Sequence, residues 1–558
     1  MKFRRNPLFR RTSVGRAQAG RGERALCGGH ARPSTRGLVQ LALLLACLTH
    51  GVQSHAQPHI LAQSSDYLEW QSRAEQPSVW ANMKADAIIT ANNLSYSSSL
   101  GGFGVKCYRL RDVASANALA YILDPDNRGD YVQNLRDNLL TGLSDLTSTH
   151  NSSAWEYHVP QGTMLFDAIL ALDVIRYDTR LSAGDRQQLE SLLDTAVSQV
   201  TTSNWKPNGQ TVRSLWGLYQ NNSSNFLSWK NSHDSGLAAM FTSGGVVIAG
   251  PTYGAARLSD TQAQAKGLYQ DVLEIQGYHQ YYSNPEYIAG HEYLYGYSHS
   301  PFGRGLTFGD AVDYSTLYEY DSSGHVDNPQ ILRAHRFSEL AGNYAAWQLQ
   351  QAAAYRPGDV NASGRLISYA TIAVDNNPVA ELAPSRLFDS YAGFIEDRQS
   401  RNALYGGLLS LTESEVHSHK EVNAIALGAY GEHVLRNAGY NGYGAGVGLA
   451  SWNWINNTAE SGNTVVINGV NHASKTGGGV THGFVGGALE FARGDSGNAL
   501  SNGKHLRDLM FVQPADGVAG YWIVADHVTP TTAGQDVEAF WHPNAANLEV
   551  QSTNQQYF

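Results

Sequence analysis

The sequence predicts an α+β multidomain protein in which a helical region is followed by an antiparallel β-sandwich. The chain has 558 residues, too many for one compact core, so two domains are expected. Apolar residues recur at helical spacing up to about Tyr355. Beyond about Gly358 they form short runs that alternate or are β-branched. We place the boundary near Tyr355–Val374, with a helical domain over 57–365 and a sandwich over 366–558.

The first 56 residues have the composition of a secretory signal peptide with a long basic n-region. Residues 1–36 are rich in arginine, and a mainly apolar run follows from Leu38 to Leu48. This run is too short to anchor the chain stably in a membrane, and Ser54-His55-Ala56 fits a cleavage site. We therefore expect an exported protein, secreted or periplasmic, that has no membrane contact after cleavage.

Removal of this segment makes the chain acidic. The segment holds ten of the 39 Lys and Arg residues and one of the 49 Asp and Glu residues, which leaves 29 basic and 48 acidic residues. This balance argues against a nucleic-acid partner, but a local basic cleft can still bind an anionic substrate. Two of the three cysteines, Cys27 and Cys47, lie in this segment. Cys107 is the one that remains after cleavage, so we expect no intrachain disulfide.

Helical periodicity is clearest in four segments of the N-terminal region. They are Tyr131–Leu143, Gly162–Tyr177, Asp185–Val200 and His335–Tyr355. Clusters of Gly, Pro, Asn and Ser separate them, as in NWKPNGQ (Asn204–Gln210). Many helices in succession without intervening strands predict an all-α layer such as a bundle, a solenoid or a toroid.

Short strand-like runs fill the C-terminal region. They are ALYGGLLSL, VNAIALGAY, NTVVING, LRDLMFVQ, GYWIVADHV and VEAFWHP. Turns rich in Gly, Asn and Asp separate them, which predicts an antiparallel sheet and most simply a sandwich. The chain stops at Phe558 soon after such a run, so a complete sandwich and one that lacks a C-terminal part both stay open.

Two histidines open the segment HSHKEVNAIALGAYGEHVLRNAGY (His417–Tyr440). If the segment begins as a strand, His417 and His419 point to the same face. Two imidazoles on one face can be a metal pair, a base with its partner, or two structural histidines with satisfied hydrogen bonds. The spacing alone leaves these three interpretations open.

The order of segments around this stretch resembles the C-terminal β-sandwich of the heparinase II/III-like polysaccharide lyases. The resemblance covers about Ser390–Pro543 and rests on HSHKE, RNAGY, SGNTVVING and GYWIVADHV. GRGLTFGD (Gly303–Asp310) and the upstream helices are compatible with the α/α toroid of that family. The resemblance implies a catalytic α/α toroid, β-elimination on a uronic-acid polysaccharide, and no required cofactor.

β-Elimination makes three demands on a site. The C5 proton of a uronate is poorly acidic while the adjacent carboxylate is charged, so donors must neutralise that carboxylate and stabilise the enolate-like intermediate. A base must remove the proton, and an acid must protonate the leaving O4. Tyr and His suit these roles because their reference pKa values, about 10 and about 6.5, lie on either side of the working pH.

Polar residues enter a helical segment in YQNNSSNFLSWKNSHDSGLAAM (Tyr219–Met240). The resemblance makes Asn231 the candidate that neutralises the substrate carboxylate and His233 its neighbour or the base. Asn222 and Asn225 are rivals for the Asn231 role. The alternative is that the residues around Asn231 form a helix N-cap, because Asn, Ser and Asp are good capping residues.

A tyrosine-rich segment follows, IQGYHQYYSNPEYIAGHEYLYGYSHS (Ile275–Ser300). The resemblance implies a catalytic Tyr some way after the Asn and His, and Tyr287 fits best, with Tyr293 in reserve. The alternating Tyr293, Tyr295 and Tyr297 could line the cleft instead. Each of these Tyr residues could equally be structural, because Tyr commonly buries its ring and bonds its hydroxyl.

The resemblance also assigns the two histidines. His417 matches a histidine that reaches into the cleft as carboxylate neutraliser or base, and His419 matches a second one. In some members the second histidine joins an Asp and a His around zinc, but here those positions read Asn437 and Gly462. Zinc prefers charged or imidazole ligands, so the sequence does not support a zinc site of this type. A calcium site is not supported either, and His419 is only a weak metal candidate. Glu421 could orient an imidazole.

Further residues are candidates for supporting roles. Arg304, Arg333 and Arg336 could bind substrate carboxylates or sulfates, because Arg contacts such anions bidentately. Most arginines are solvated surface groups, which is the alternative for each of them. His472 and His482 are nearby histidines that could replace the missing zinc ligands.

Three functions stay open at this point. The first is an exported lyase that cleaves an anionic uronate polysaccharide in a cleft between toroid and sandwich. The second is a glycoside hydrolase on an α/α toroid, with Asp234, Glu286 and Glu292 as candidate acids. The third is a non-catalytic polysaccharide-binding protein. The sequence does not select among heparan, chondroitin or dermatan, hyaluronan, alginate and ulvan.

Overall fold

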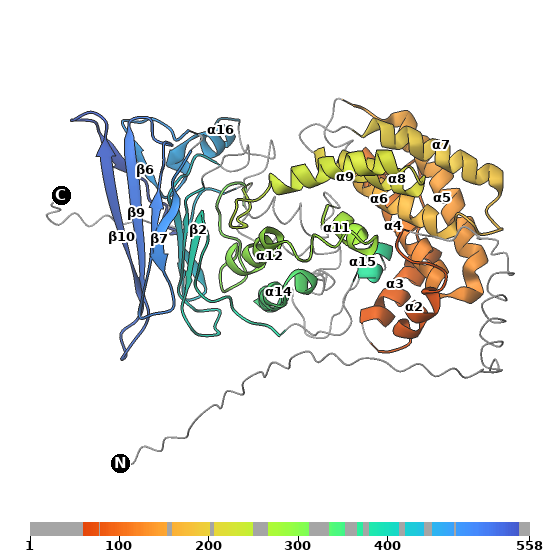
Figure 1. The fold of residues 1–558 in the computed structure, drawn as a ribbon, viewed down its shortest axis with the longest axis horizontal. Helices are drawn as coiled ribbons and strands as arrows, with labels where there is room; N and C mark the ends of the chain where they lie inside the picture. Colours follow the sequence, from red (N-terminus) through yellow and green to blue (C-terminus); the bar gives the residue numbers. More distant parts are fainter. Residues whose placement is uncertain are drawn as a thin grey trace, which may run out of the picture. The chain divides into compact units, whose positions relative to one another are not determined.

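The chain, in a computed structural model, folds into a helical region followed by antiparallel β-sheets (Figure 1). This confirms the predicted fold class. The structure describes residues 60–77, 79–152, 159–200, 206–248, 266–311, 334–351, 365–371, 379–411, 419–439, 449–473 and 476–545. The predicted signal peptide lies outside this range. In the described residues, no helix is both long enough and apolar enough to cross a membrane.

The first helices pack as antiparallel neighbours around a buried pair. They are α2 (Tyr67–Ala74), α3 (Val79–Asn93), α4 (Phe103–Leu123), η1 (Pro125–Asn127), α5 (Arg128–Thr149), α6 (Val159–Ile175), α7 (Ala183–Gln199), α8 (Lys206–Tyr219) and α9 (Ser223–Ala238). Every residue of α6 is buried, and α4 packs against α3, α5 and α6. A helix that is buried on all sides belongs to an inner layer, whereas α5 and α7 each bury one face, as in an α/α toroid.

The helical region continues with α11 (Lys266–Ile275), α12 (Pro285–Glu292), the π-helical turn η3 (Tyr293–Tyr297), α14 (Glu339–Gln351) and α15 (Leu366–Thr371). The last of these returns to the first helices. Arg365 Nη2 lies 2.6 Å from the Asp167 carboxylate of α6, and Ser115 of α4 donates to the same carboxylate at 2.9 Å. The Tyr369 hydroxyl donates to the Trp70 carbonyl of α2. These contacts close the succession of helices on itself.

In the part of the chain that the structure describes, the strands form three antiparallel sheets, and Figure 1 shows β7, β9 and β10 side by side. The five-stranded sheet contains β1 (Arg386–Leu387), β2 (Tyr391–Ile395), β3 (Tyr405–Leu409), β4 (Ala424–Ala429) and β5 (Glu432–Leu435) in that order. The four-stranded sheet has the order β10 (Tyr521–Pro530), β9 (Gly503–Val512), β8 (Leu489–Asp495) and β7 (Gly479–Phe484). A third sheet pairs β11 (Val537–Ala539) with β6 (Val465–Ile467), near α16 (Leu449–Asn457) and η4 (Ala459–Ser461).

The five-stranded sheet is covered on both faces. Phe394, Leu408 and Ile425 share one apolar cluster with Leu509 and Phe511 of the four-stranded sheet. Alternate residues of the same strands, among them Tyr391 and Tyr405, belong to the core of the helical region. Strands β2, β3 and β4 are therefore buried along their whole length, which explains why their sequences are almost continuously apolar.

Asp389, in the turn between β1 and β2, binds the loop that follows α9. Its carboxylate accepts hydrogen bonds from the hydroxyls of Thr242 and Ser243, at 2.7 and 2.8 Å, and from the backbone N–H of Gly244 at 2.9 Å. A Cβ on Gly244 would lie 2.7 Å from this carboxylate, so the approach requires glycine. The carboxylate therefore fixes the C-terminal end of α9 against the sandwich.

Replacement of Asp389 by Ala is expected to lower the free energy of unfolding by about 2–3 kcal/mol, because four donors, the three of the loop and the Ser390 hydroxyl, lose a charged acceptor. Denaturant unfolding followed by tryptophan fluorescence measures the change. The matched control is Asp397→Ala, which removes an exposed carboxylate of the same sheet. Equal stability of the two variants would contradict this role of Asp389.

Candidate functional site

Helix α9 carries two of the predicted site residues, and it begins earlier than the capping interpretation requires. Its N-cap is Asn222, whose Oδ1 accepts the backbone N–H of Asn225 at 3.0 Å. Asn231 lies two turns inside the helix, so the interpretation of its surroundings as an N-cap is wrong. Asn222 and Asn225, the two rivals, thus lie at the opposite end of α9 from the loop that Asp389 binds.

The buried face of α9 includes His233 but not Asn231. Phe226, Lys230, His233 and Leu237 are buried, with the spacing of four, three and four residues that places them on one side of a helix. Asn231 falls on a different side and is exposed. The structure therefore does not bring these two predicted residues together, and the role of Asn231 stays a prediction.

His233 is buried in the helical core. Its Nδ1 is 3.4 Å from the hydroxyl of Thr211, and its ring meets the ring of Tyr269 edge-on at 4.8 Å between centroids. The Tyr269 hydroxyl bonds the Ser214 hydroxyl of α8, and burial raises the pKa of Tyr269. The imidazole is thus held between α8 and α11 by one polar and one aromatic contact.

Asp234, the next residue, collects donors from the tyrosine-rich segment. The Tyr281 hydroxyl donates to Oδ1 at 2.6 Å, while Lys230 Nζ and Gln280 Nε2 donate to Oδ2 at 2.6 and 3.2 Å. Burial, followed by the hydrogen bond to this carboxylate, raises the pKa of Tyr281. Neither Tyr281 nor Lys230 was predicted as a site residue, although both belong to the two segments that carry the predicted residues.

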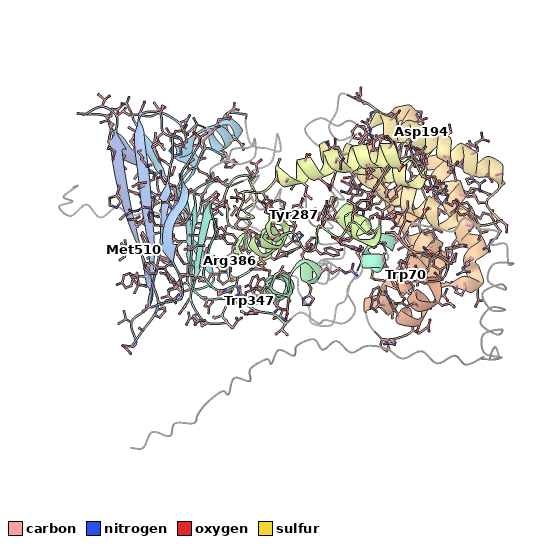
Figure 2. The ribbon with its side chains drawn as sticks, viewed as in Figure 1. Trp70, Asp194, Tyr287, Trp347, Arg386 and Met510 are labelled. Atoms are coloured by element: carbon pink, nitrogen blue, oxygen red, sulfur yellow. The ribbon has the colours of Figure 1, made fainter. Side chains whose placement is uncertain are left out.

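Tyr287 lies in the first turn of α12 and is labelled in Figure 2. The helix begins there because Asn284 Oδ1 accepts the backbone N–H groups of Glu286 and Tyr287. The Tyr287 ring stacks on Tyr281, with centroids 6.0 Å apart and an interplanar angle of 8°, and packs against Phe241. Tyr287 is thereby linked through Tyr281 to Asp234, beside His233.

The electrostatics of this cluster favour a neutral phenol at Tyr287. Burial, and then the negative charge of Asp234, raise the pKa of Tyr287. A phenol that stays protonated at working pH can donate a proton to a leaving oxygen, which is the task of a general acid. We call Lys230, His233, Asp234, Tyr281 and Tyr287 the α9–α12 cluster.

The other tyrosines of the segment pack inside the protein. Tyr293 meets Phe388 and Tyr391 edge-on, and Tyr297 meets Phe388 and Tyr344 in the same way. All three tyrosines of η3, Tyr295 included, are buried to within 2% of full coverage. The rings of Tyr293 and Tyr297 join the helical region to the five-stranded sheet, so in this structure they serve packing.

His417 lies outside the described residues, and the local structure of His419 differs from the expected strand. His419 lies in a turn with a left-handed backbone (φ 46°), and β4 begins only at Ala424. The two-residue strand spacing therefore does not apply to His419. The turn allows its ring to reach Asp310, with Nε2 2.8 Å from Oδ1, while Nδ1 lies 3.9 Å from Oε1 of Glu421.

The side chains of Asp310, His419 and Glu421 are buried, and the two carboxylates affect the pKa of the imidazole between them. Burial disfavours the charged imidazole, but the hydrogen bond to Asp310 and the charge of Glu421 outweigh it and raise the pKa of His419. Burial also raises the pKa of Glu421 to about 7, against the opposing effect of His419 and of the Gly309 N–H. Glu421 was predicted as a partner for an imidazole, whereas Asp310, at the end of GRGLTFGD, was not predicted as a site residue.

Among the remaining candidates, Glu292, Arg336 and His472 make contacts within the protein. Glu292 binds Arg386 of β1 and the Ser338 hydroxyl, so it holds α12 against the sandwich. Arg336 lies 5.9 Å from the ring of Tyr282, and Arg304 is exposed. Arg333 falls outside the described residues. His472 accepts the Val422 N–H, and His482 is exposed on β7.

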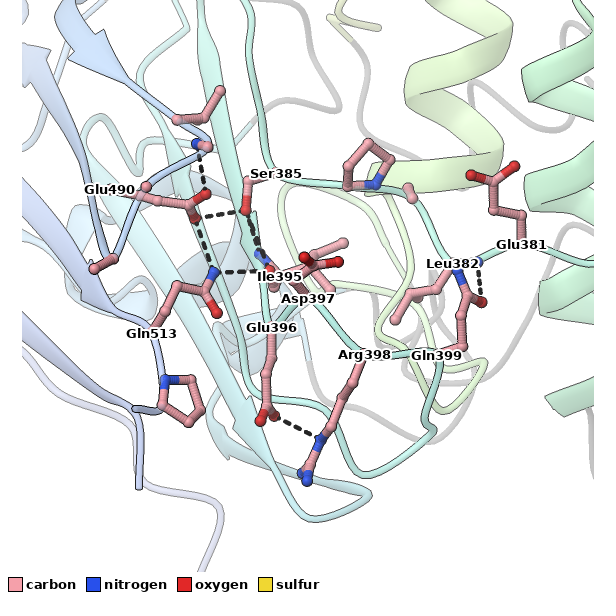
Figure 3. Close-up of a pocket in the computed structure, with 17 residues that line it drawn as sticks. Glu381, Leu382, Ser385, Ile395, Glu396, Asp397, Arg398, Gln399, Glu490 and Gln513 are labelled. Carbon is pink, nitrogen blue, oxygen red and sulfur yellow. Dashed lines mark hydrogen bonds and ion pairs between the residues drawn. The ribbon is translucent and has the colours of Figure 1, made fainter. Parts of the chain in front are cut away.

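A pocket of about 640 Å³ opens in the sandwich, apart from the α9–α12 cluster (Figure 3). Its charged lining residues are Glu381, Glu396, Asp397, Arg398 and Glu490. Ser385 Oγ and the Gly486 N–H donate to Glu490, at 2.6 and 2.9 Å. Carboxylates outnumber the single guanidinium, so this pocket does not suit an anionic polymer.

Comparison with known proteins identifies the fold. No protein family model and no curated protein matches the chain. Among solved structures, heparan sulfate lyase HepC from Pedobacter heparinus matches with a TM-score of 0.51 and 11% identity, over 89% of this chain and 77% of that one. A structure titled heparinase III matches with a TM-score of 0.50 and 12% identity, over 89% and 78%.

A HepC mutant from the same organism matches with a TM-score of 0.50 and 12% identity, over 80% of this chain and 65% of that one. The chain thus spans less than two thirds of the length of that mutant. Identities this low concern the fold alone, and they agree with the resemblance found in the sequence. The chain has the fold of the heparinase III and heparan sulfate lyase structures, an α/α toroid followed by an antiparallel β-sandwich.

Proposed function

We propose that the protein is an exported polysaccharide lyase that cleaves a uronic-acid-containing anionic polysaccharide by β-elimination. The observation that carries the proposal is the α9–α12 cluster. It stacks the buried Tyr287 on Tyr281, whose hydroxyl binds Asp234 next to His233, in a fold whose solved examples include proteins titled heparan sulfate lyase. Tyr and His are the residue types that elimination at a uronate demands.

In this proposal the groups have distinct tasks. His417 and Asn231 neutralise the substrate carboxylate, which makes the C5 proton more acidic. A base, His233 or His417, takes that proton, the C4–O4 bond breaks and a C4–C5 double bond forms. Tyr287 gives its proton to the leaving O4, because its raised pKa keeps it protonated until that moment.

The test is ultraviolet absorbance during incubation of the purified protein with heparan sulfate, chondroitin sulfate, hyaluronan, alginate and ulvan. We expect absorbance to rise on at least one of them, because elimination creates a double bond conjugated to the carboxylate. New reducing ends without a rise in absorbance would instead indicate the hydrolase. Binding without either signal would indicate a non-catalytic protein.

Replacement of His417 by Ala is expected to abolish the absorbance signal while leaving the thermal unfolding midpoint unchanged. The imidazole would otherwise neutralise or deprotonate the substrate, and general catalysis of this kind contributes about 10²–10⁴-fold. His527→Ala, which removes an exposed imidazole from β10, is the matched control. Full activity of the His417 variant would refute the role of His417.

A further inference from the structure

We propose that Asp310, His419 and Glu421 form a metal-free cross-link between the segment 305–311 and the sandwich, in which the Glu421 side chain fills the space that a metal ligand would need. The proposal concerns the position that the sequence resemblance associates with zinc. It does not depend on the proposed lyase activity, because the contacts of the cross-link can be tested through stability and metal content.

The cross-link joins the segment 305–311 to the residues that precede β4. His419 Nε2 lies 2.8 Å from Asp310 Oδ1, and the Gly309 N–H donates to Glu421 Oε1. Asn456 of α16 makes a further side-chain hydrogen bond to His419. The three ionisable side chains are at least nine-tenths buried. A buried charge is tolerated only where opposite charges and hydrogen bonds compensate it, and here one imidazole lies between two carboxylates.

The residues around this cluster do not fit a metal ion. A Cβ on Gly462 would lie 2.6 Å from Glu421 Cβ and 3.0 Å from its Oε2, so a ligating side chain at this position would collide with Glu421. Asn437 Oδ1 already accepts the backbone N–H of Asn463 at 2.7 Å and its side-chain amide at 3.2 Å. Within the described residues, no group of three or more His, Cys, Asp or Glu side chains is arranged to hold a metal.

The position of His419 in the chain determines which segment the cross-link fixes. His419 comes two residues after His417, and Asp310 closes the GRGLTFGD segment of the helical region. The chain is thus fixed to the helical region directly after the histidine that the lyase proposal uses. Buried ion pairs of this kind contribute mainly by leaving an uncompensated charge when one partner is removed.

The first experiment measures metal content and thermal unfolding of the full-length protein. After incubation with zinc and exhaustive dialysis, we expect less than one tenth of an equivalent of zinc per chain by plasma mass spectrometry. The unfolding midpoint should be the same with and without a chelator. One equivalent of retained zinc, together with a midpoint that the chelator lowers, would overturn the proposal.

The second experiment tests the carboxylate. Glu421→Ala should lower the unfolding midpoint by several degrees, whereas Glu432→Ala, which removes an exposed carboxylate from β5, should not. Asp310→Ala should add less than its own effect when combined with Glu421→Ala, because both act on His419. A Glu421 variant as stable as the Glu432 control, or fully additive losses, would contradict the cross-link.

A third variant restores the ligand types. The combination of Glu421→Gly, Asn437→Asp and Gly462→His removes both the Cβ and the carboxylate of Glu421 beside position 462, and it supplies two new ligands beside His419. We expect zinc to raise its unfolding midpoint, while zinc leaves the parent protein unchanged. If the triple variant does not fold, the metal content and the Glu421 comparison still decide the proposal.

Discussion

Replacement of Tyr287 by Phe is expected to lower kcat/KM about 10²–10⁴-fold on the substrate that the absorbance screen identifies. The substitution keeps the ring that stacks on Tyr281 and removes only the hydroxyl that would protonate O4. Because the ring contacts remain, the unfolding midpoint should change little. Initial rates at several substrate concentrations measure the effect, which should fall mainly on kcat, since the hydroxyl acts in the transition state.

The matched control for this variant is Tyr131→Phe. The Tyr131 hydroxyl donates to Asp124 at 2.7 Å in the outer part of the helical region, so its loss should lower stability and leave kcat/KM unchanged. If Tyr287→Phe keeps full activity, the acid must be another group. Tyr281, whose hydroxyl is bound to Asp234, would then be the first residue to test.

Replacement of Asp526 by Ala is expected to destabilise the sandwich by about 3 kcal/mol, at the lower end of the range for breaking a buried ion pair. Asp526 lies on β10 and binds the fully buried Arg507, with Nε and Nη2 at 2.6 and 3.0 Å from its two oxygens. His505 Nε2 lies 2.9 Å from the same carboxylate. The expected loss lies at this lower end because the Asp526 side chain is 20% exposed and water screens part of its charge.

The same pair makes stability depend on pH. Burial disfavours the charged carboxylate, but His505 and Arg507 outweigh it and hold the pKa of Asp526 below its usual range. A folded pKa below the unfolded value of about 3.9 gives stability that is present above that value and lost as pH falls below it. We therefore expect the free energy of unfolding, measured with urea, to fall less between neutral pH and about pH 3 in the Asp526→Ala variant than in the parent protein.

Asp536→Ala is the control for both measurements, because Asp536 is exposed and only its backbone carbonyl bonds Asn468. This variant should unfold like the parent at both pH values. An Asp526 variant with the parent's stability at neutral pH would show that Arg507 finds compensation elsewhere. The two backbone carbonyls that its Nη1 contacts, those of Asn423 and Asn463, are the available acceptors.

Local periodicity explains how much of the fold was predictable. The predicted helices at Gly162–Tyr177 and Asp185–Val200 correspond to α6 and α7, and the run GYWIVADHV corresponds to β10. These patterns are visible because the period of buried residues follows from the geometry of one element. The bonds of Asp389 to the loop after α9, and of Gly309 to Glu421, join residues more than 100 positions apart. No local pattern encodes such pairs.

The arrangement of the candidate site was likewise only partly predictable from local patterns. The family resemblance assigned Asn231 and His233 to one site, but helical phase places them on different sides of α9. The phase could have been read from Phe226, Lys230 and Leu237, which lie on the side of His233 at helical spacing. The stacking of Tyr281 on Tyr287 was not predictable from the sequence. It depends on the direction of α12 relative to Tyr281, which is set where Asn284 caps the start of that helix.

The closure of the helices by Arg365 and Asp167 sets an order of events during synthesis. Asp167 is translated 198 residues before its partner. At about 5–20 residues per second, the carboxylate and the fully buried α6 wait about 10–40 s for α15 to arrive. During that time the apolar surface that α15 will cover is open to other chains. A chaperone that holds the emerging helical region apart until residue 371 has been made would therefore raise the yield of folded protein.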